Sequence, residues 1–134
     1  MKVLLDTDTC IHLIRYKPGA MIQRLRRYTP GDVGISSITM AELFFGAAKG
    51  QHQERNKAAL DDFTAPLEIA PFDAAAAVTY GTVRAMLDIR GTRIGALDTL
   101  IGAHALTLKV TLVTHNTREF SRITGLRLAD WITT

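Results

Sequence analysis

The sequence has a single cysteine and no apolar stretch that approaches membrane-spanning length. A helix that crosses a bilayer needs about 20 consecutive apolar residues, so no membrane segment is expected. Cys10 cannot form an internal disulfide, which is typical of a reducing compartment, and one cysteine does not make a zinc site. No basic segment followed by an apolar one opens the chain, so no secretion signal is expected. These absences predict a cytoplasmic protein.

Net charge is also small. The chain has 16 basic and 13 acidic residues, for a net charge of +3, which is weak support for a nucleic-acid partner. Arginine outnumbers lysine 11 to 5. Arginine suits bidentate phosphate contacts, although genome base composition can produce the same bias. The 134 residues, 47% of them hydrophobic, predict a single domain over residues 1–134 with a substantial core.

What the sequence does contain is an alternation of short apolar runs and amphipathic stretches. Asp8 is the expected cap of the first helix, and Ser36 and Ser37 cap the third. The alternation predicts an α/β fold in which helices cover a mostly parallel sheet. Strands are expected at residues 3–5, 33–35, 67–69, 110–113 and 126–128, and helices at 9–16, from 18, 37–49, 51–63, 73–90 and 96–108.

The first apolar run, Val3–Leu5, is the most informative because Asp6 follows it at once. Open α/β sheets bind their ligands just beyond the carboxyl ends of the strands. A charge next to a buried strand is costly unless something compensates it. Asp6 is therefore expected to meet a substrate or a metal ion.

Further acids can reach the same edge of the sheet. Glu42 lies early in the helix that follows the second strand, Asp98 lies in the first turns of a later helix, and Asn116 and Glu119 follow the fourth strand. Each has an ordinary structural explanation as well. Thr39 to Glu42 and Asn116 to Glu119 fit capping boxes, and the helix dipole alone favours Asp98.

Several carboxylates gathered at one edge would repel each other unless a cation joined them. Carboxylate oxygens are the ligands that Mg²⁺ and Mn²⁺ prefer. One or two such ions can activate water and stabilise the charge of a phosphodiester that is being cleaved. The acids together therefore indicate metal-dependent phosphodiester chemistry.

Five segments carry a resemblance to a known family along the whole chain, in order and at the family's spacing: Leu4–Ile11, Ile35–Leu43, Asp98–Ala105, Leu112–Phe120 and Gly125–Trp131. With them the sequence resembles PIN-domain ribonucleases, and among these the VapC toxins of bacterial toxin–antitoxin pairs. It departs at Asp8, where VapC toxins usually carry asparagine. The fourth acid is variable in the family, so either Glu119 is a ligand or it acts through water with Asn116.

The resemblance implies a three-layer α/β/α PIN-like fold, a homodimer, and Mg²⁺-dependent RNA cleavage in which Mn²⁺ can substitute. It implies a tRNA substrate, the initiator tRNA cut in its anticodon stem-loop. It also implies a VapB-like antitoxin that blocks the active site, with promoter DNA bound only through the complex of the two. The implied catalytic residues are Asp6, Glu42, Asp98 and Glu119, the first three as metal ligands, and the implied substrate contacts are Thr114, Asn116 and Arg118.

Two alternatives remain at this point. The first is a phosphatase of the haloacid dehalogenase type, with Asp6 as nucleophile and Asp8 as acid, although the later lysine and paired-acid motifs are missing. The second is a PIN-like protein that binds RNA or an antitoxin without cleaving. His12 and His104 are expected to be structural. The role of His115, which lies beside the site, is left open.

Overall fold

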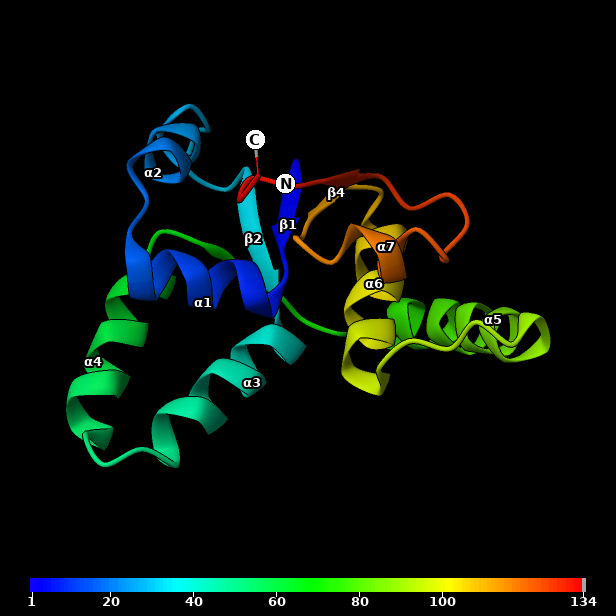
Figure 1. Ribbon diagram of the computed structural model, residues 1–134, viewed down its shortest axis with the longest axis horizontal. Coiled ribbons are helices and arrows are strands. Elements are labelled where there is room, and N and C mark those ends of the chain that lie inside the picture. Colours follow the sequence, from blue (N-terminus) through cyan, green and yellow to red (C-terminus); the bar gives the residue numbers. More distant parts are fainter. Residues whose placement is uncertain (134) are drawn as a thin grey trace.

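The computed structural model describes residues 1–133, which contain a sheet of five parallel strands (Figure 1). The strand order is β3-β2-β1-β4-β5, and every neighbouring pair is parallel. All carboxyl ends of the strands therefore lie along one edge, as the sequence predicted. The strands are β1 (Val3–Leu5), β2 (Val33–Ser36), β3 (Glu68–Ala70), β4 (Thr111–Val113) and β5 (Leu128–Ala129).

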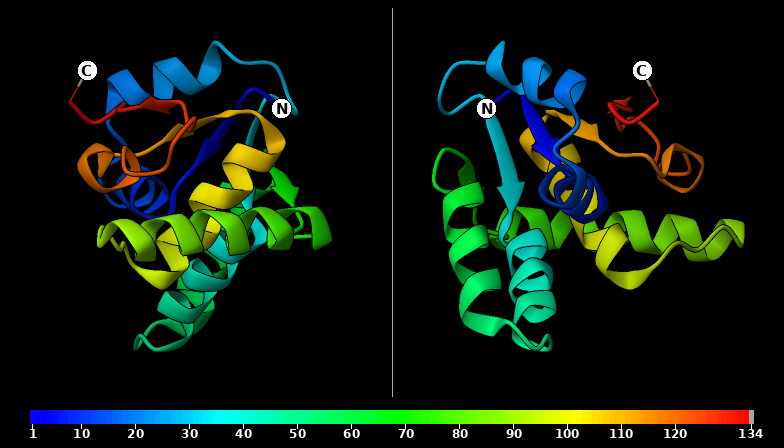
Figure 2. Two further views of the ribbon diagram at one scale, coloured as in Figure 1. Left: turned by 90° about the vertical axis from the view of Figure 1, so that its right-hand side faces the viewer. Right: turned by 60° about the vertical axis from the view of Figure 1, so that its left-hand side comes forward.

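Seven helices in the described residues cover the two faces of this sheet, which confirms the three-layer α/β/α fold (Figures 1 and 2). One face is covered by α1 (Thr7–Tyr16), α2 (Gly19–Arg26), α3 (Ser37–Ala48) and α4 (Gln53–Thr64). The other face is covered by α5 (Ala74–Arg90), α6 (Ala96–Leu108) and the short α7 (Thr117–Phe120). Each helix in this part of the chain is too short or too polar to span a lipid bilayer.

The pleat of the central strand divides the core into two parts. Val3 and Leu5 pack against the α1–α4 layer, whereas Leu4, between them, packs against α5 and α6. Leu4 and Leu5 are fully buried, and each such side chain contributes about 1.5–3 kcal/mol. A strand that is buried on both faces needs an unbroken apolar run, which explains why the run ends where the sheet ends.

The structure corrects three expectations about helix starts. The cap of α1 is Asp6 and not Asp8, because the Asp6 carboxylate accepts a hydrogen bond from the Thr9 backbone N–H at 2.8 Å. The Thr39 to Glu42 capping box is wrong, since Ser36 caps α3 and places Glu42 in its second turn. The Asn116 to Glu119 capping box is also wrong, because the Asn116 side chain makes no cap hydrogen bond to the backbone of α7.

Other boundaries shift by a residue or two. The predicted strand at residues 67–69 begins one residue later, and the predicted strand at 126–128 lies at Leu128–Ala129. Both are edge strands, where a few apolar residues give little periodicity. The helix α7 was not predicted, because four residues are too few for a helical pattern.

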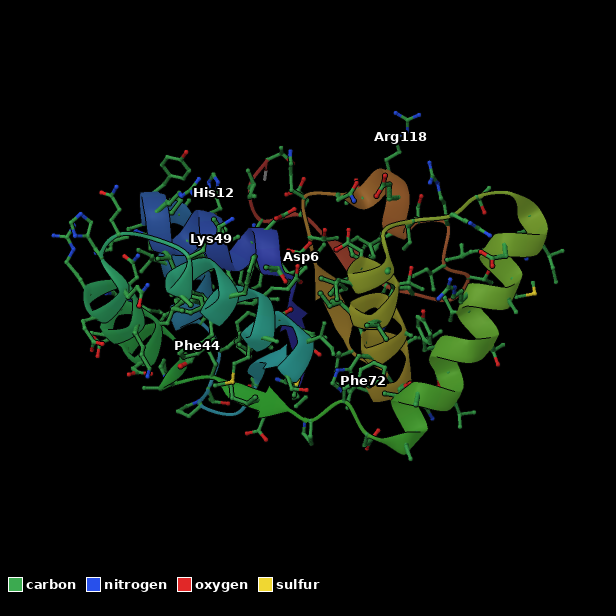
Figure 3. All side chains as sticks on the ribbon, turned by 90° about the horizontal axis from the view of Figure 1, so that it is seen from below. Asp6, His12, Phe44, Lys49, Phe72 and Arg118 are labelled. Carbon is green, nitrogen blue, oxygen red and sulfur yellow. The ribbon has the colours of Figure 1, made fainter. Side chains whose placement is uncertain are left out.

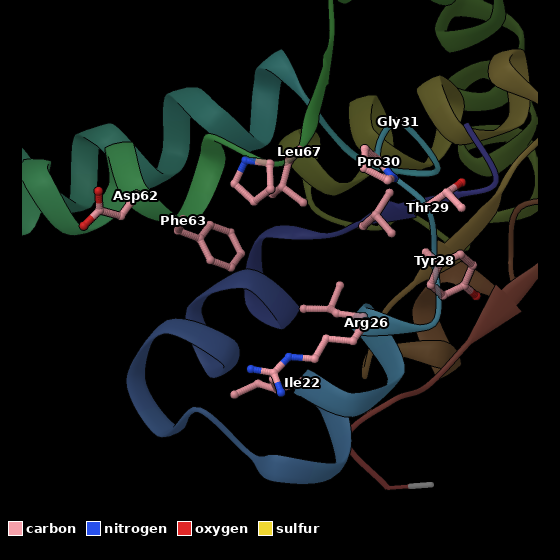
Figure 4. Close-up of a pocket in the computed structure, with 12 residues that line it drawn as sticks. Ile22, Arg26, Tyr28, Thr29, Pro30, Gly31, Asp62, Phe63 and Leu67 are labelled. Carbon is pink, nitrogen blue, oxygen red and sulfur yellow. The ribbon is translucent and has the colours of Figure 1, made fainter.

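An apolar pocket of about 400 Å³ lies at the opposite edge from the acids (Figure 4). Its walls are α2 with the turn after it and the end of α4, including Ile22, Tyr28 and Phe63. Val33, the first residue of β2, also lines it. The pocket therefore belongs to the amino ends of the strands.

Candidate active site

Asp6 is the most buried of the four predicted acids, with 3% of its surface exposed. It follows β1 directly, and its backbone N–H continues the sheet by donating to Val113 O at 3.0 Å. Burial raises the pKa of Asp6, and this outweighs the hydrogen bonds from Thr114 and Thr9 that favour the charged form. The carboxylate thus combines the capping of α1 with a place at the carboxyl edge of the sheet (Figure 3).

The pKa of Asp98 depends on its burial and on the other acids at this edge. Asp98 lies in the first turn of α6, and its pKa is raised to about 6, first by burial and then by Asp6, Asp8, Glu42 and Glu119. Acids on or next to α1, α3 and α7 therefore lie close enough to Asp98 to disfavour its ionisation. The structure brings together all four acids that the sequence predicted, with Asp8 as a fifth, exposed neighbour.

Glu42 is held by the first residue of α1. The Thr7 hydroxyl donates to Glu42 Oε1 at 2.6 Å and lies 3.1 Å from Thr39 Oγ1. Thr7 and Thr39 are buried, so this contact joins α1 to α3 inside the protein. The capping of α1 by Asp6 and the anchoring of Glu42 by Thr7 depend on the same helical turn.

Asn116 and Glu119 form a pair of their own. Asn116 Nδ2 donates to Glu119 Oε2 at 2.9 Å, and the Asn116 backbone N–H donates to Thr114 Oγ1 at 3.0 Å. Thr114 is fully buried and also contacts Asp6 through its side chain. Arg118 is exposed and projects outward from α7 (Figure 3). The residues predicted to contact RNA thus follow β4 in the sequence and lie on the β4 side of the acids.

The sequence missed one feature of this edge, the pairing of His115 with Asp130. His115 Nδ1 lies 3.0 Å from Asp130 Oδ2, and 54% of the histidine side chain is exposed. Burial alone would raise the pKa of Asp130, but hydrogen bonds from Thr133, Ile132 and His115 together lower it. One feature of the sequence could have indicated this pair: Asp130 follows the last apolar run of the chain, as Asp6 follows the first.

His104 is structural, as predicted. It is buried, its Nδ1 lies 2.8 Å from Ser36 Oγ, and its ring meets Phe72 edge to face. Burial lowers the pKa of His104, although Asp73 and a hydrogen bond to the Pro71 backbone act in the other direction. His12 packs on Tyr16 with the ring centroids 4.9 Å apart.

The donor chemistry of the acids suits a hard divalent cation. Among residues 1–133 no group of three or more histidine, cysteine, aspartate or glutamate side chains is already arranged to hold an ion. The donors near one another are nevertheless carboxylate oxygens. The pKa of Asp98 is raised first by burial and then by the negative charges of the neighbouring acids, and a cation would offset those charges. A metal role for Asp6, Glu42 and Asp98 stays a prediction.

The raised pKa of Asp98 predicts how stability depends on pH in metal-free protein. In the unfolded chain the carboxyl releases its proton near 3.8, and in the fold near 6. The contribution of the Asp98 carboxyl to the free energy of unfolding is therefore fully present below pH 3.8 and is lost as pH rises to about 6. Melting curves of wild type and Asp98→Asn should diverge across this window, with the variant more stable above it. Because solvent screens a half-exposed carboxyl, Asp98→Asn should be more stable than wild type by about 1 kcal/mol, which corresponds to a few degrees in melting temperature.

The difference between the two proteins is the quantity to follow, because Asp32 and Asp130 have lowered pKa values and give stability the opposite dependence on pH. Millimolar Mg²⁺ should stabilise wild type more than Asp98→Asn, since an ion that binds only the folded state stabilises it. Parallel curves at every pH would contradict the crowding of the acids.

Comparison with known proteins gives a consistent picture. The family model described as PIN domain matches residues 3–126. The chain is 41% identical over 131 residues to the tRNA(fMet)-specific endonuclease VapC of Shigella flexneri, covering 98% of each protein. It is 37% identical over 132 residues to ribonuclease VapC2 of Haemophilus influenzae strain Rd, covering 98% of this chain and 99% of that one.

Solved structures agree with these relatives. The DNA-bound VapBC from Salmonella typhimurium contains a chain with a TM-score of 0.95 and 42% identity, and 98% of each chain is covered. The VapBC2 from Rickettsia felis, bound to a DNA fragment from the promoter, gives a TM-score of 0.92 and 37% identity over 98% of this chain and 99% of that one.

Proposed function

The chain belongs to the PIN-domain family, among the VapC ribonucleases, and we propose that it is the toxin of a toxin–antitoxin pair that cleaves RNA. The observation that carries the proposal is the acidic edge, where the charges of Asp6, Glu42 and Glu119 help to raise the pKa of the half-buried Asp98. The phosphatase alternative is set aside, because the matching family model and the relatives are those of PIN nucleases.

We propose that Asp6 and Asp98 hold a divalent cation, Mg²⁺ with Mn²⁺ as a substitute, and that Glu42 completes the site. When bound, such an ion activates water and offsets negative charge on a phosphodiester. Thr7 holds the Glu42 carboxylate, and Thr9 and Thr114 hold that of Asp6, so these hydroxyl and amide groups fix where the oxygens point.

Glu119 is proposed as the peripheral acid of the site. Its carboxylate is occupied on one oxygen by Asn116 Nδ2, which leaves the other oxygen for a water or an ion. Thr114, Asn116 and Arg118 are proposed to contact the RNA. Among these, Arg118 brings an exposed positive charge, which suits an approaching phosphate and offsets the repulsion from the acids.

For the substrate we propose initiator tRNA, cut in the anticodon stem-loop, because relatives from Shigella flexneri and Salmonella typhimurium carry the name tRNA(fMet)-specific endonuclease. We also propose a VapB-like antitoxin as partner, with promoter DNA bound through the joint complex, since the similar structures are VapBC complexes with DNA. The homodimer stays a prediction.

The test is cleavage by the purified protein of initiator tRNA and of an elongator tRNA, with Mg²⁺, Mn²⁺ or excess EDTA. We expect a single cut in the anticodon stem-loop of the initiator tRNA, little cleavage of the elongator, and none in EDTA. Full cleavage in EDTA would overturn the metal role. Absence of cleavage of any RNA under all conditions would favour the inactive PIN-like alternative.

A further inference from the structure

An exposed imidazole stands beside the acidic edge, held at one nitrogen only. His115 directly follows Thr114, whose side chain contacts Asp6. Its Nδ1 lies 3.0 Å from Asp130 Oδ2, while 54% of the side chain remains exposed. The structure gives Nε2 no hydrogen-bond partner within the described part of the chain. This nitrogen is therefore available to a ligand.

The carboxylate that holds the ring is itself fixed. Asp130 Oδ1 accepts from the Ile132 backbone N–H at 2.9 Å, and Oδ2 accepts from the Thr133 hydroxyl at 2.7 Å. Its side chain is only 16% exposed. A carboxylate oriented by several donors cannot follow a rotating imidazole, so the ring must adopt the direction that Asp130 imposes.

The contact also determines which nitrogen carries the proton. An ionised carboxylate only accepts hydrogen bonds, so His115 Nδ1 must donate to Asp130. In the neutral ring the exposed Nε2 then carries a lone pair and acts as an acceptor. Phosphate oxygens also only accept and cannot pair with it, whereas the 2′-hydroxyl of a ribose can donate.

The location suits a nucleotide next to the one being cut. His115 follows β4, the neighbour of β1, and Asp130 follows β5, the next strand. The pair is therefore displaced from Asp6 by about one to two strand spacings, or roughly 5–10 Å, along the same edge. Arg118 lies on this side of the acids as well.

We propose that His115 reads the sugar of the substrate: its Nε2 accepts a hydrogen bond from the 2′-hydroxyl of a nucleotide adjacent to the scissile phosphate. Asp130 is the positioning residue that sets the tautomer and the direction of the ring. The inference rests on the proposed RNA cleavage and adds to it a device that distinguishes RNA from DNA, since only RNA carries the 2′-hydroxyl.

The test is a double-mutant cycle that combines substitutions in the protein with 2′-deoxy substitutions in the RNA. Binding is measured in an Asp98→Asn background so that the RNA stays intact. The probe is a fluorescent anticodon stem-loop RNA, and a set of copies each carries one 2′-deoxy nucleotide. At one position the deoxy substitution should weaken binding about 3- to 10-fold, as expected for one neutral hydrogen bond. His115→Ala should weaken binding of the all-RNA probe by a similar factor, and the two losses should not add.

Two further variants sharpen the result. His115→Gln keeps a side-chain acceptor and should restore part of the coupling. Asp130→Asn still accepts from the Ile132 N–H, but its amide can donate to Nδ1 and so release the fixed tautomer; it should lose the coupling at the same position while remaining folded. His52→Ala, an exposed histidine before α4, is the matched control and should bind every probe as the parent does.

Losses that add at every position would overturn the inference, and so would coupling of His115 to a neutral phosphate analogue in place of a deoxy sugar. The proposed function is tested separately, by cleavage with the wild-type protein. RNA binding without the coupling removes only the sugar-reading role. Absence of both RNA binding and cleavage removes the role together with the proposed function.

Discussion

Asp98→Asn should reduce RNA cleavage by more than about 100-fold while the protein remains folded. The substitution keeps the shape of the side chain and removes the charge that a cation requires. Loss of an outer-shell partner of a metal ligand already costs 10- to 100-fold, so loss of a proposed ligand should cost more. The measurement is the single-turnover rate on initiator tRNA at saturating Mg²⁺, together with a melting curve in EDTA.

Asp8→Asn is the matched control for this prediction. Asp8 also raises the pKa of Asp98, yet it is exposed in the first turn of α1. Asp8 is not among the proposed metal ligands, so the variant should cleave at close to the wild-type rate. Asp6→Asn should behave as Asp98→Asn does, because asparagine can still cap α1 through its carbonyl oxygen while the charge is lost. Wild-type rates in either ligand variant would refute the proposed metal site.

The acidic edge could be anticipated because its signal is local. A fully buried strand must be apolar along its length, so the charge at Asp6 marks the residue where the sheet ends. Parallel strands place their carboxyl ends together, which allowed acids from distant segments to be assigned to one edge. The structure agrees, since Asp98 responds to the acids on α1, α3 and α7.

What could not be anticipated depends on contacts across the chain. Thr7 and Glu42 are 35 residues apart, and His115 and Asp130 are 15 apart, so neither pair leaves a periodic pattern in the sequence. The double role of Asp6 is hidden for another reason. Asp8 is an equally good cap by composition, and only the direction of the chain after β1 selects Asp6.

Induced expression of the wild-type protein alone should stop growth, and co-expression of its VapB-like antitoxin should restore it. Expression of Asp98→Asn at the same level should leave growth intact. The physical reason lies in the same acids. An antitoxin arginine inserted against Asp6, Glu42 and Asp98 would make charge-assisted hydrogen bonds and occupy the place of the metal. The low solvation of Asp6, which is 3% exposed, makes such a charge partner more valuable there than on the surface.

This arrangement makes a quantitative prediction for antitoxin binding. Asp98→Asn should weaken the complex by about 10- to 100-fold, the factor for one hydrogen bond to a charged group, whereas Asp8→Asn should leave the affinity close to wild type. Isothermal titration with purified antitoxin measures both, and added Mg²⁺ should compete with the antitoxin for the wild-type protein. Unchanged affinity for Asp98→Asn would place the antitoxin elsewhere on the surface. Unimpaired growth and intact tRNA on wild-type induction would refute the toxin function, even with the PIN fold in place.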